Sequence, residues 1–138
     1  MTPVLLDTGV IVALLHQRDA RHEDCAEAIA ELHRPFITCE AVITESCYLL
    51  QRSPRAVLAV MSNIDNGLFR LPLRMAESAV AIRALMHKYR NVPASLADAC
   101  LIQMADEFDA GDILTLDSDF LTYRWRRNRP FHMLIPAK

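Results

Sequence analysis

Short apolar runs alternate with longer segments of helical periodicity along the whole chain. The first run, Pro3–Leu6, is entirely apolar, which is typical of a strand buried on both faces of a sheet. Further strands are predicted at residues 35–38, 68–71, 112–116 and 132–135. Because strands and helices alternate, the pattern predicts an α/β domain with a mostly parallel central sheet of roughly four to five strands.

The predicted helices begin and end at residues that favour helix boundaries. Thr38 and Ser95 are expected to cap the helices that follow them. Ser53 and Pro54 open another helix, since proline favours the first helical position, and Ala110–Gly111 ends the helix that starts after Ser95. The helices are predicted at residues 10–15, 20–32, 38–51, 53–66, 75–89 and 95–110.

Composition limits the class of protein. The chain has 138 residues, of which 52% are hydrophobic and 23% charged, and it shows no repeat and no linker. We therefore expect one globular domain over residues 1–138. The net charge of −2 excludes a strongly basic nucleic-acid module but not an enzyme that acts on nucleic acid through metal ions. Only Lys88 and Lys138 among the 15 basic residues are lysines, which leaves almost no candidate for lysine-based catalysis.

The cysteines and the apolar segments indicate the cellular compartment in which the protein is expected. The four cysteines form no CxxC pair and lie in apolar surroundings, which is typical of a reduced, cytoplasmic protein. The apolar run at residues 3–15 is interrupted by Asp7 and is shorter than the ~20 residues that span a membrane, so no membrane association is expected.

A zinc site can also be drawn from His22, Cys25, His33 and Cys39, although the spacings of these residues match no zinc-finger pattern.

Two acidic residues directly follow predicted strands. Asp7 comes after the first strand, and Asp117 comes after the strand that starts at Asp112. In open parallel α/β sheets, ligand sites lie outside the carboxyl ends of the strands, so both acids are predicted at the functional edge. The structural alternatives are a helix N-cap for Asp7 and an ordinary turn residue for Asp117.

Two further acids occupy helix faces that are otherwise apolar. Glu45 shares a face with Ala41, Val42, Tyr48 and Leu49, and this face is predicted to point into the core. Asp98 shares a face with Leu101, Ile102 and Ala105. Ser95 and Asp98 also fit a capping box, a role that is compatible with ligand binding.

These acids come from separate elements and are predicted to converge at one edge of the sheet. Clustered carboxylates raise one another's pKa unless a positive charge neutralises them. Because lysine is nearly absent, a divalent cation is the simplest source of that charge. All-oxygen ligation favours Mg²⁺ or Mn²⁺ over zinc. Such a site supports metal-assisted hydrolysis of a phosphodiester.

Four stretches in this order and spacing resemble the PIN domain, and specifically the VapC toxin family of type II toxin–antitoxin systems. The resemblance extends over essentially the whole chain. It rests on residues 5–15 (LLDTGVIVALL), 44–50 (TESCYLL), 94–102 (ASLADACLI) and 113–121 (ILTLDSDFL).

The resemblance implies a three-layer α/β/α fold and an acidic catalytic and metal-binding quartet. The quartet corresponds to Asp7, Glu45, Asp98 and Asp117. The resemblance also implies supporting roles for Thr8, beside the first acid, and Ser95, beside the third. Asp119 is a second acid close to the fourth position. Asp117 is favoured there because it follows the strand directly, and Asp119 stays open as an auxiliary ligand.

The activity implied is a Mg²⁺- or Mn²⁺-dependent endoribonuclease that acts on single-stranded or structured RNA. A homodimer and a VapB-like antitoxin partner are implied as well. The alternative is a PIN-like module that binds RNA or protein without cleaving it. A complete acidic quartet favours the enzyme.

A basic cluster with one interleaved aromatic residue lies near the C-terminal end. It suggests contacts with RNA phosphates and stacking on a base. A solvated loop or a dimer contact is the interpretation that we favour. The cluster contains Arg124, Trp125, Arg126 and Arg127.

Overall fold

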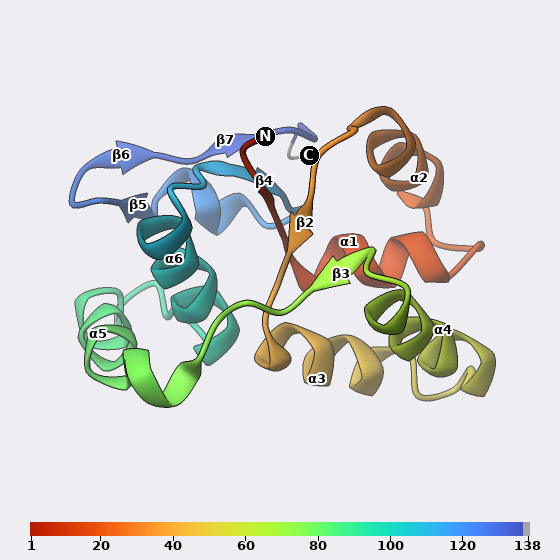
Figure 1. Cartoon of the computed structure of the whole chain (residues 1–138), viewed down its shortest axis with the longest axis horizontal. Coiled ribbons are helices and arrows are strands. Elements are labelled where there is room, and N and C mark those ends of the chain that lie inside the picture. The colour runs from red at the N-terminus through yellow and green to blue at the C-terminus, as the bar shows by residue number, and fades with distance from the viewer. Residues whose placement is uncertain (137–138) are drawn as a thin grey trace.

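The computed structural model describes residues 1–136 and confirms a three-layer α/β/α arrangement around a central sheet (Figure 1). The sheet has five strands in the order β3-β2-β1-β4-β7, and every neighbouring pair is parallel. The last two residues of the predicted domain, 137–138, lie outside the described residues. The strands are β1 (Val4–Leu6), β2 (Phe36–Ile37), β3 (Phe69–Arg70), β4 (Asp112–Leu114) and β7 (His132–Met133).

All of the predicted helices are present, with ends that differ by a few residues from the expected ones. The helices are α1 (Thr8–Leu15), α2 (His22–Glu31), α3 (Glu40–Leu49), α4 (Pro54–Asp65), α5 (Met75–Lys88) and α6 (Leu96–Phe108). Helix α1 packs against α2, α3 and α4, whereas α6 packs against α5 and β1. Within residues 1–136, no helix is long and apolar enough to cross a membrane.

The core is built around β1 and α6. All three residues of β1 are fully buried, as expected for the central strand of a parallel sheet covered on both faces. Leu101, Ile102 and Met104 of α6 are also fully buried. Each of these side chains contributes roughly 1.5–3 kcal/mol of hydrophobic stabilisation. These two elements also carry Asp7 and Asp98 at or near their ends, so the core holds both acids in place.

The backbone hydrogen bonds between β1 and β4 continue as far as Asp7. We call the end of the sheet where Asp7 and the other quartet acids lie the acidic edge. Leu6 pairs with Leu114, and the Asp7 N–H donates to the Leu114 carbonyl at 3.0 Å. Asp7 is therefore held beside Thr115, the residue that follows β4. This register brings the carboxyl ends of the two central strands together.

At two helix boundaries, the residue that caps or ends the helix differs from the predicted one. Thr38 does not cap α3: the cap residue is Cys39, and the buried Thr38 hydroxyl instead donates to the Leu6 carbonyl at 2.7 Å. A buried hydroxyl between two strands is best satisfied by the nearest backbone carbonyl. Helix α6 ends at Phe108, and its C-cap residue Asp109 adopts a left-handed conformation with φ 53°, just before the predicted Ala110–Gly111.

The segment after β4 has structure that the sequence did not predict. A short 3-10 helix, η1 (Ser118–Leu121), is followed by an antiparallel hairpin of β5 (Arg124–Trp125) and β6 (Arg129–Pro130). Arg126 and Arg127 in the hairpin loop have φ angles of 42° and 73°. No glycine marks this turn, so the usual sequence signal of a hairpin is missing.

Replacing Gly111 with alanine is expected to lower the free energy of unfolding by about 1–3 kcal/mol. A Cβ at residue 111 would lie 2.6 Å from Cε2 of Trp125, whose ring is buried and cannot easily move away. Urea denaturation would measure the loss.

The matched control is Gly9→Ala. Its Cβ would meet only Leu116 at an ordinary 3.6 Å, inside a helix where alanine is favoured over glycine. Equal stability of the two variants would contradict the close packing of Trp125 on Gly111.

Candidate active site

Asp7 is the N-cap of α1 and the most deeply buried acid of the predicted quartet. The residue is only 6% exposed. The Thr8 N–H donates to Oδ1 at 2.8 Å, and the Thr115 hydroxyl donates to Oδ2 at 2.6 Å. Both donors are neutral, so Asp7 keeps its full negative charge whenever it is ionised.

Thr115 joins two of the acids and was not predicted from the sequence. Its fully buried Oγ1 donates to Asp7 and accepts the backbone N–H of Asp117 at 3.0 Å. This one hydroxyl thus links the side chain of Asp7, directly after β1, to the backbone of Asp117, which follows β4. The available signal was a threonine two residues before Asp117 in an otherwise apolar run.

Asp98 makes the predicted capping box at the start of α6. Its N–H donates to the Ser95 hydroxyl at 3.1 Å, and its Oδ2 accepts the Ser95 N–H at 3.3 Å. The same Oδ2 accepts a second bond from the Tyr123 hydroxyl at 3.0 Å. Ser95 is a predicted supporting residue, whereas no role for Tyr123 at this site was predicted from the sequence.

Asp117 and Asp119 have different surroundings. Asp117 caps η1, where its Oδ1 accepts the Asp119 N–H at 2.9 Å. The charge of Asp117 raises the pKa of both Asp7 and Asp98. Both Asp117 and Asp119 add to the negative charge around the Tyr123 hydroxyl, but only Asp117 is also among the charges that raise the pKa of Asp7 and Asp98. The structure therefore groups Asp117 with Asp7 and Asp98, and it places Asp119 beside the group.

The predicted surroundings of Glu45 are wrong. Glu45 is exposed, and Tyr48 and Leu49 on the same side of α3 are 67% and 57% exposed. An apolar stripe on a helix looks the same in the sequence whether the domain's own core covers it or not. Glu45 nevertheless lies close enough for its charge to raise the pKa of Asp98. The structure thus brings it toward the other acids from the solvent side.

Burial and mutual repulsion both favour protonation at this site. Burial raises the pKa of Asp7 to about 6, and the charges of Asp98 and Asp117 add to this effect. Burial also raises the pKa of Asp98 above its usual value. Within residues 1–136, no arginine, lysine or histidine forms an ion pair with Asp7, Glu45, Asp98 or Asp117. The acidic edge therefore carries negative charge without a positive partner.

The residues present fit a hard divalent cation by charge and by donor type. All candidate ligands are oxygens, as Mg²⁺ and Mn²⁺ prefer. The buried Oγ1 of Thr8 has no hydrogen-bond partner in the described part of the chain, and such an atom commonly marks a place for water or an ion.

The acids do not form a closed ligand shell. Among the described residues, no three His, Cys, Asp or Glu side chains are grouped closely enough to hold one ion directly. Mg²⁺ commonly keeps several waters and needs only one or two carboxylates from the protein. The open arrangement of the acids therefore fits Mg²⁺ better than it fits a cation that takes all its ligands from the protein.

The zinc hypothesis is wrong. His22 Nδ1 lies 2.8 Å from the Ala13 carbonyl, and Cys39 is fully buried in the core. The other two candidates, Cys25 and His33, form no metal-binding group with them in the part of the chain that the structure describes.

The basic cluster does not offer a stacking platform. Trp125 is 7% exposed, its Nε1 donates to the Pro130 carbonyl, and the guanidinium groups of Arg126 and Arg129 lie 5.6 and 5.2 Å from the centre of its ring. Its faces are therefore covered, contrary to the base-stacking hypothesis.

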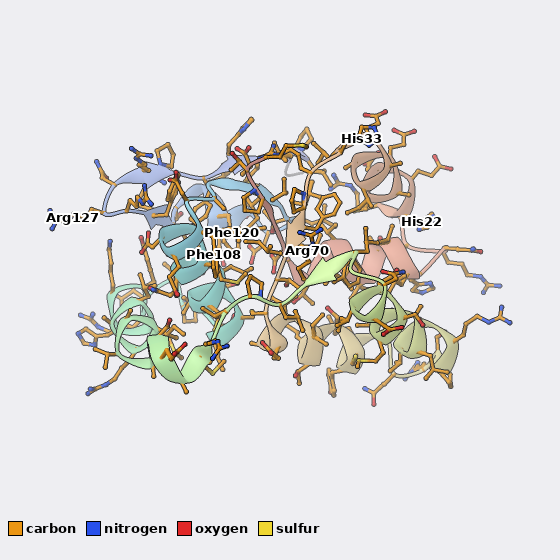
Figure 2. All side chains as sticks on the ribbon, in the orientation of Figure 1. His22, His33, Arg70, Phe108, Phe120 and Arg127 are labelled. Atoms are coloured by element: carbon orange, nitrogen blue, oxygen red, sulfur yellow. The ribbon has the colours of Figure 1, made fainter. Side chains whose placement is uncertain are left out.

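The arginines of this cluster have different surroundings. Arg124 donates to carbonyls at the end of η1, and Arg126 pairs with Asp109 at 2.8 Å. Arg127 is exposed and extends outward from the hairpin (Figure 2). Among the described arginines of the cluster, Arg127 is thus the least constrained.

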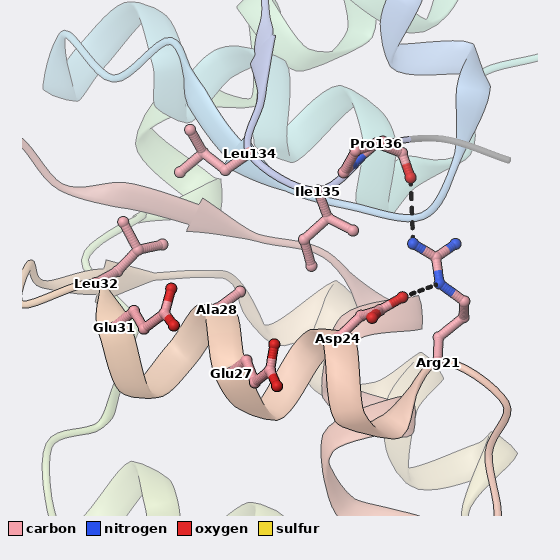
Figure 3. Close-up of a pocket in the computed structure, with 9 residues that line it drawn as sticks. All are labelled: Arg21, Asp24, Glu27, Ala28, Glu31, Leu32, Leu134, Ile135 and Pro136. Carbon is pink, nitrogen blue, oxygen red and sulfur yellow. Dashed lines mark hydrogen bonds and ion pairs between the residues drawn. The ribbon is translucent and has the colours of Figure 1, made fainter.

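A separate groove of about 650 Å³ lies between α2 and the segment that follows β7 (Figure 3). Glu27 and Glu31 line one side, and Leu134 and Ile135 line the other. Arg21 at one end is bound to Asp24 and to the Pro136 carbonyl. None of the quartet acids lines this groove, so it is distinct from the acidic edge.

Comparisons with known proteins identify relatives of this chain. The chain matches the family model of the PIN domain over residues 4–125. It is 25% identical over 116 residues to ribonuclease VapC26 of Mycobacterium tuberculosis, a match covering 83% of this chain and 86% of that protein. The crystal structure of M. tuberculosis VapC20, described as a sarcin–ricin loop cleaving toxin, superposes with a TM-score of 0.76 at 20% identity. That match covers 84% of this chain and 91% of VapC20 and shows a shared fold.

Replacing Asp7 with asparagine is expected to stabilise the cation-free protein near neutral pH by up to about 3 kcal/mol. The pKa of Asp7 rises from 3.8 to about 6 on folding, so the folded chain holds a proton that the unfolded chain has lost. The free energy of unfolding therefore falls as the pH rises through this interval. Asparagine removes that dependence and remains a good N-cap.

Urea denaturation in EDTA, at about pH 4 and at about pH 7.5, would test this expectation. Glu23→Gln on the exposed face of α2 is the matched control and should leave the pH dependence unchanged. A lower stability of Asp7→Asn than of the wild type at the higher pH would contradict it.

Proposed function

The chain belongs to the PIN domain family, and we propose that it is a metal-dependent endoribonuclease, the toxin of a VapBC-type toxin–antitoxin module. The observation that carries the proposal is the convergence of acids from four elements at one edge of the sheet without a basic partner. The likeness to VapC26, which is named a ribonuclease, supports RNA as the substrate.

The four acids of the quartet would hold Mg²⁺ or Mn²⁺ partly through water molecules, with Asp119 as an auxiliary ligand, because no three of the described acids are grouped closely enough to hold one ion directly. When bound, the cation supplies activation of a water molecule and stabilisation of charge on the leaving oxygen of a phosphodiester. The products expected from attack by water are a 5′-phosphate and a 3′-hydroxyl. The quartet is Asp7, Glu45, Asp98 and Asp117.

The chain's own contacts assign different tasks to the residues around the acids. Thr115 orients Asp7, and Ser95 orients Asp98, because each donates to one carboxylate oxygen. The unpartnered Thr8 hydroxyl is available to a water molecule at the site. Burial around Asp7 strengthens its attraction for a cation, since charges interact more strongly away from solvent.

The same uncompensated charge supports a VapB-like antitoxin as the partner. A segment of such a partner that presents an arginine would form charge-assisted hydrogen bonds with the carboxylates and block the site. The four cysteines are free thiols, which supports action in the reducing cytoplasm, where RNA and the antitoxin meet the enzyme.

A homodimer is supported by apolar side chains next to the site. A groove of about 620 Å³ is lined by Tyr48 of α3, Met75 of α5 and Leu96 of α6. These side chains are 67%, 38% and 41% exposed. We propose that a second copy of the chain covers this groove, because clustered exposed apolar groups commonly mark a protein interface.

The second candidate is a PIN-like module that binds RNA or a protein partner without cleavage. The observation that favours it is the open spacing of the acids within residues 1–136. RNA cleavage assays separate the two candidates.

Purified protein is expected to cut single-stranded RNA in Mg²⁺ or Mn²⁺ and to lose this activity in EDTA. Asp7→Asn and Asp98→Asn should each lower the rate more than about 100-fold, because each removes a charged ligand. Labelled RNA resolved on a gel would show the products and their ends.

The control for this assay is Asp65→Asn, at an exposed position at the end of α4. It should cut like the wild type. Equal cleavage by the wild type and both site variants would reveal a contaminating nuclease, and RNA binding without cleavage would favour the non-catalytic module.

Light scattering coupled to gel filtration is expected to give twice the 15.6 kDa mass of the chain. Met75→Glu should shift the protein to a monomer by placing a charge in the groove. Leu58→Glu, at a 68% exposed position on α4 outside the groove, should remain dimeric. A monomeric wild type, or a dimer unaffected by Met75→Glu, would contradict the proposed interface.

A further inference from the structure

Tyr123 is a fully buried tyrosine whose hydroxyl points at one of the site acids. It follows η1 and has no exposed surface. Its hydroxyl donates to Oδ2 of Asp98 at 3.0 Å. Burial and the charge of Asp98 raise the pKa of this hydroxyl above its ordinary value, so it stays protonated and remains a donor.

The ring of Tyr123 is held on two sides by other aromatic rings. Tyr89 meets it edge-on with ring centres 4.9 Å apart, and Phe120 does so at 5.0 Å. Phe120 in turn packs edge-on against Phe131 at 5.4 Å. Such contacts fix the orientation of a ring, so the hydroxyl is presented to Asp98 from a rigid base.

The hydrogen bond distinguishes the two oxygens of Asp98. Oδ2 accepts both the Ser95 N–H and the Tyr123 hydroxyl, whereas Oδ1 accepts no donor from the described residues. A carboxylate held in this way has one occupied oxygen and one that remains available to a ligand. A tyrosine achieves this without adding positive charge, whereas an arginine or lysine would cancel the charge that attracts a cation.

Tyr123 also joins two parts of the site. It lies on the same segment as Asp117, six residues farther along the chain by their numbers, and it contacts the first turn of α6 through Asp98. The bond therefore holds the segment that carries Asp117 against the helix that carries Asp98.

We propose that Tyr123 is a positioning residue that orients Asp98 so that Oδ1 can bind the divalent cation. The inference rests on the proposed function, since it concerns the same cation. Removing the hydroxyl frees Asp98 to rotate and loosens the segment of Asp117, so cation affinity falls while the aromatic core remains filled.

The test is a titration of the Tyr123→Phe variant with Mn²⁺ in the absence of RNA. Electron paramagnetic resonance of the free ion measures how much Mn²⁺ is bound. Loss of an outer hydrogen bond to a metal ligand typically weakens binding about 10- to 100-fold, and we expect a change in this range. RNA cleavage by this variant should require a correspondingly higher Mn²⁺ concentration and should recover when Mn²⁺ is saturating.

The matched control is Tyr89→Phe. It removes a hydroxyl from the same aromatic cluster, but this hydroxyl accepts the backbone N–H of Arg124 and does not touch Asp98. Its Mn²⁺ affinity should stay within about twofold of the wild type. Equal affinities of the two variants would overturn the inference while the proposed function stands. Absence of Mn²⁺ binding by the wild type would overturn both.

A second measurement decides the matter if Tyr123→Phe does not fold. The wild type would be labelled with 3-fluorotyrosine, and its three tyrosine resonances assigned with single phenylalanine variants of Tyr48 and Tyr89. The fluorine resonance of Tyr123 should shift during a Mg²⁺ titration with the midpoint of cation binding. An unchanged resonance at saturating Mg²⁺ would overturn the inference.

Discussion

The accumulation of negative charge at the carboxyl edge of the sheet is the constraint on which the rest of the structure depends. Asp7 is almost completely buried, yet its two hydrogen-bond donors are neutral. Asp7 and Asp98 both lie at the N-terminal ends of helices, where the helix dipole gives partial compensation. The remaining repulsion is tolerated because β1 and α6, the most buried elements, hold both acids and leave them little room to move.

Much of the fold was predictable because the physical signals are local. Every strand of the parallel sheet lay in a largely apolar run, although β3, β4 and β7 each include one charged or polar residue. Helix starts such as Ser53–Pro54 and Ser95 carried their own capping residues. Asp7 could be identified because an acid that directly follows a buried strand lies at the ligand-binding edge. Asp117 was found by the same reasoning, although β4 ends at Leu114, two residues earlier than predicted. Glu45 was assigned to the site for a partly wrong reason, since periodicity identifies an apolar face but does not tell what covers it.

The residues that the sequence did not reveal act through contacts between distant segments. Thr115 bonds to an acid 108 positions away, and Tyr123 bonds to one 25 positions away. A single threonine or tyrosine in an apolar segment has no local pattern that distinguishes a hydrogen-bonded role from simple packing. The hairpin of β5 and β6 was missed for a related reason: arginines adopt its left-handed turn positions, and burial of Trp125 stabilises it.

The double role of the Thr115 hydroxyl has a consequence for how the site tolerates change. Because one oxygen both donates to Asp7 and accepts from the backbone of Asp117, a shift on either side alters the bond on the other. Residues that share a partner in this way do not contribute additively to stability. Positions 7, 115 and 117 therefore form one cooperative unit, and a replacement at one of them changes which replacements the other two can accept.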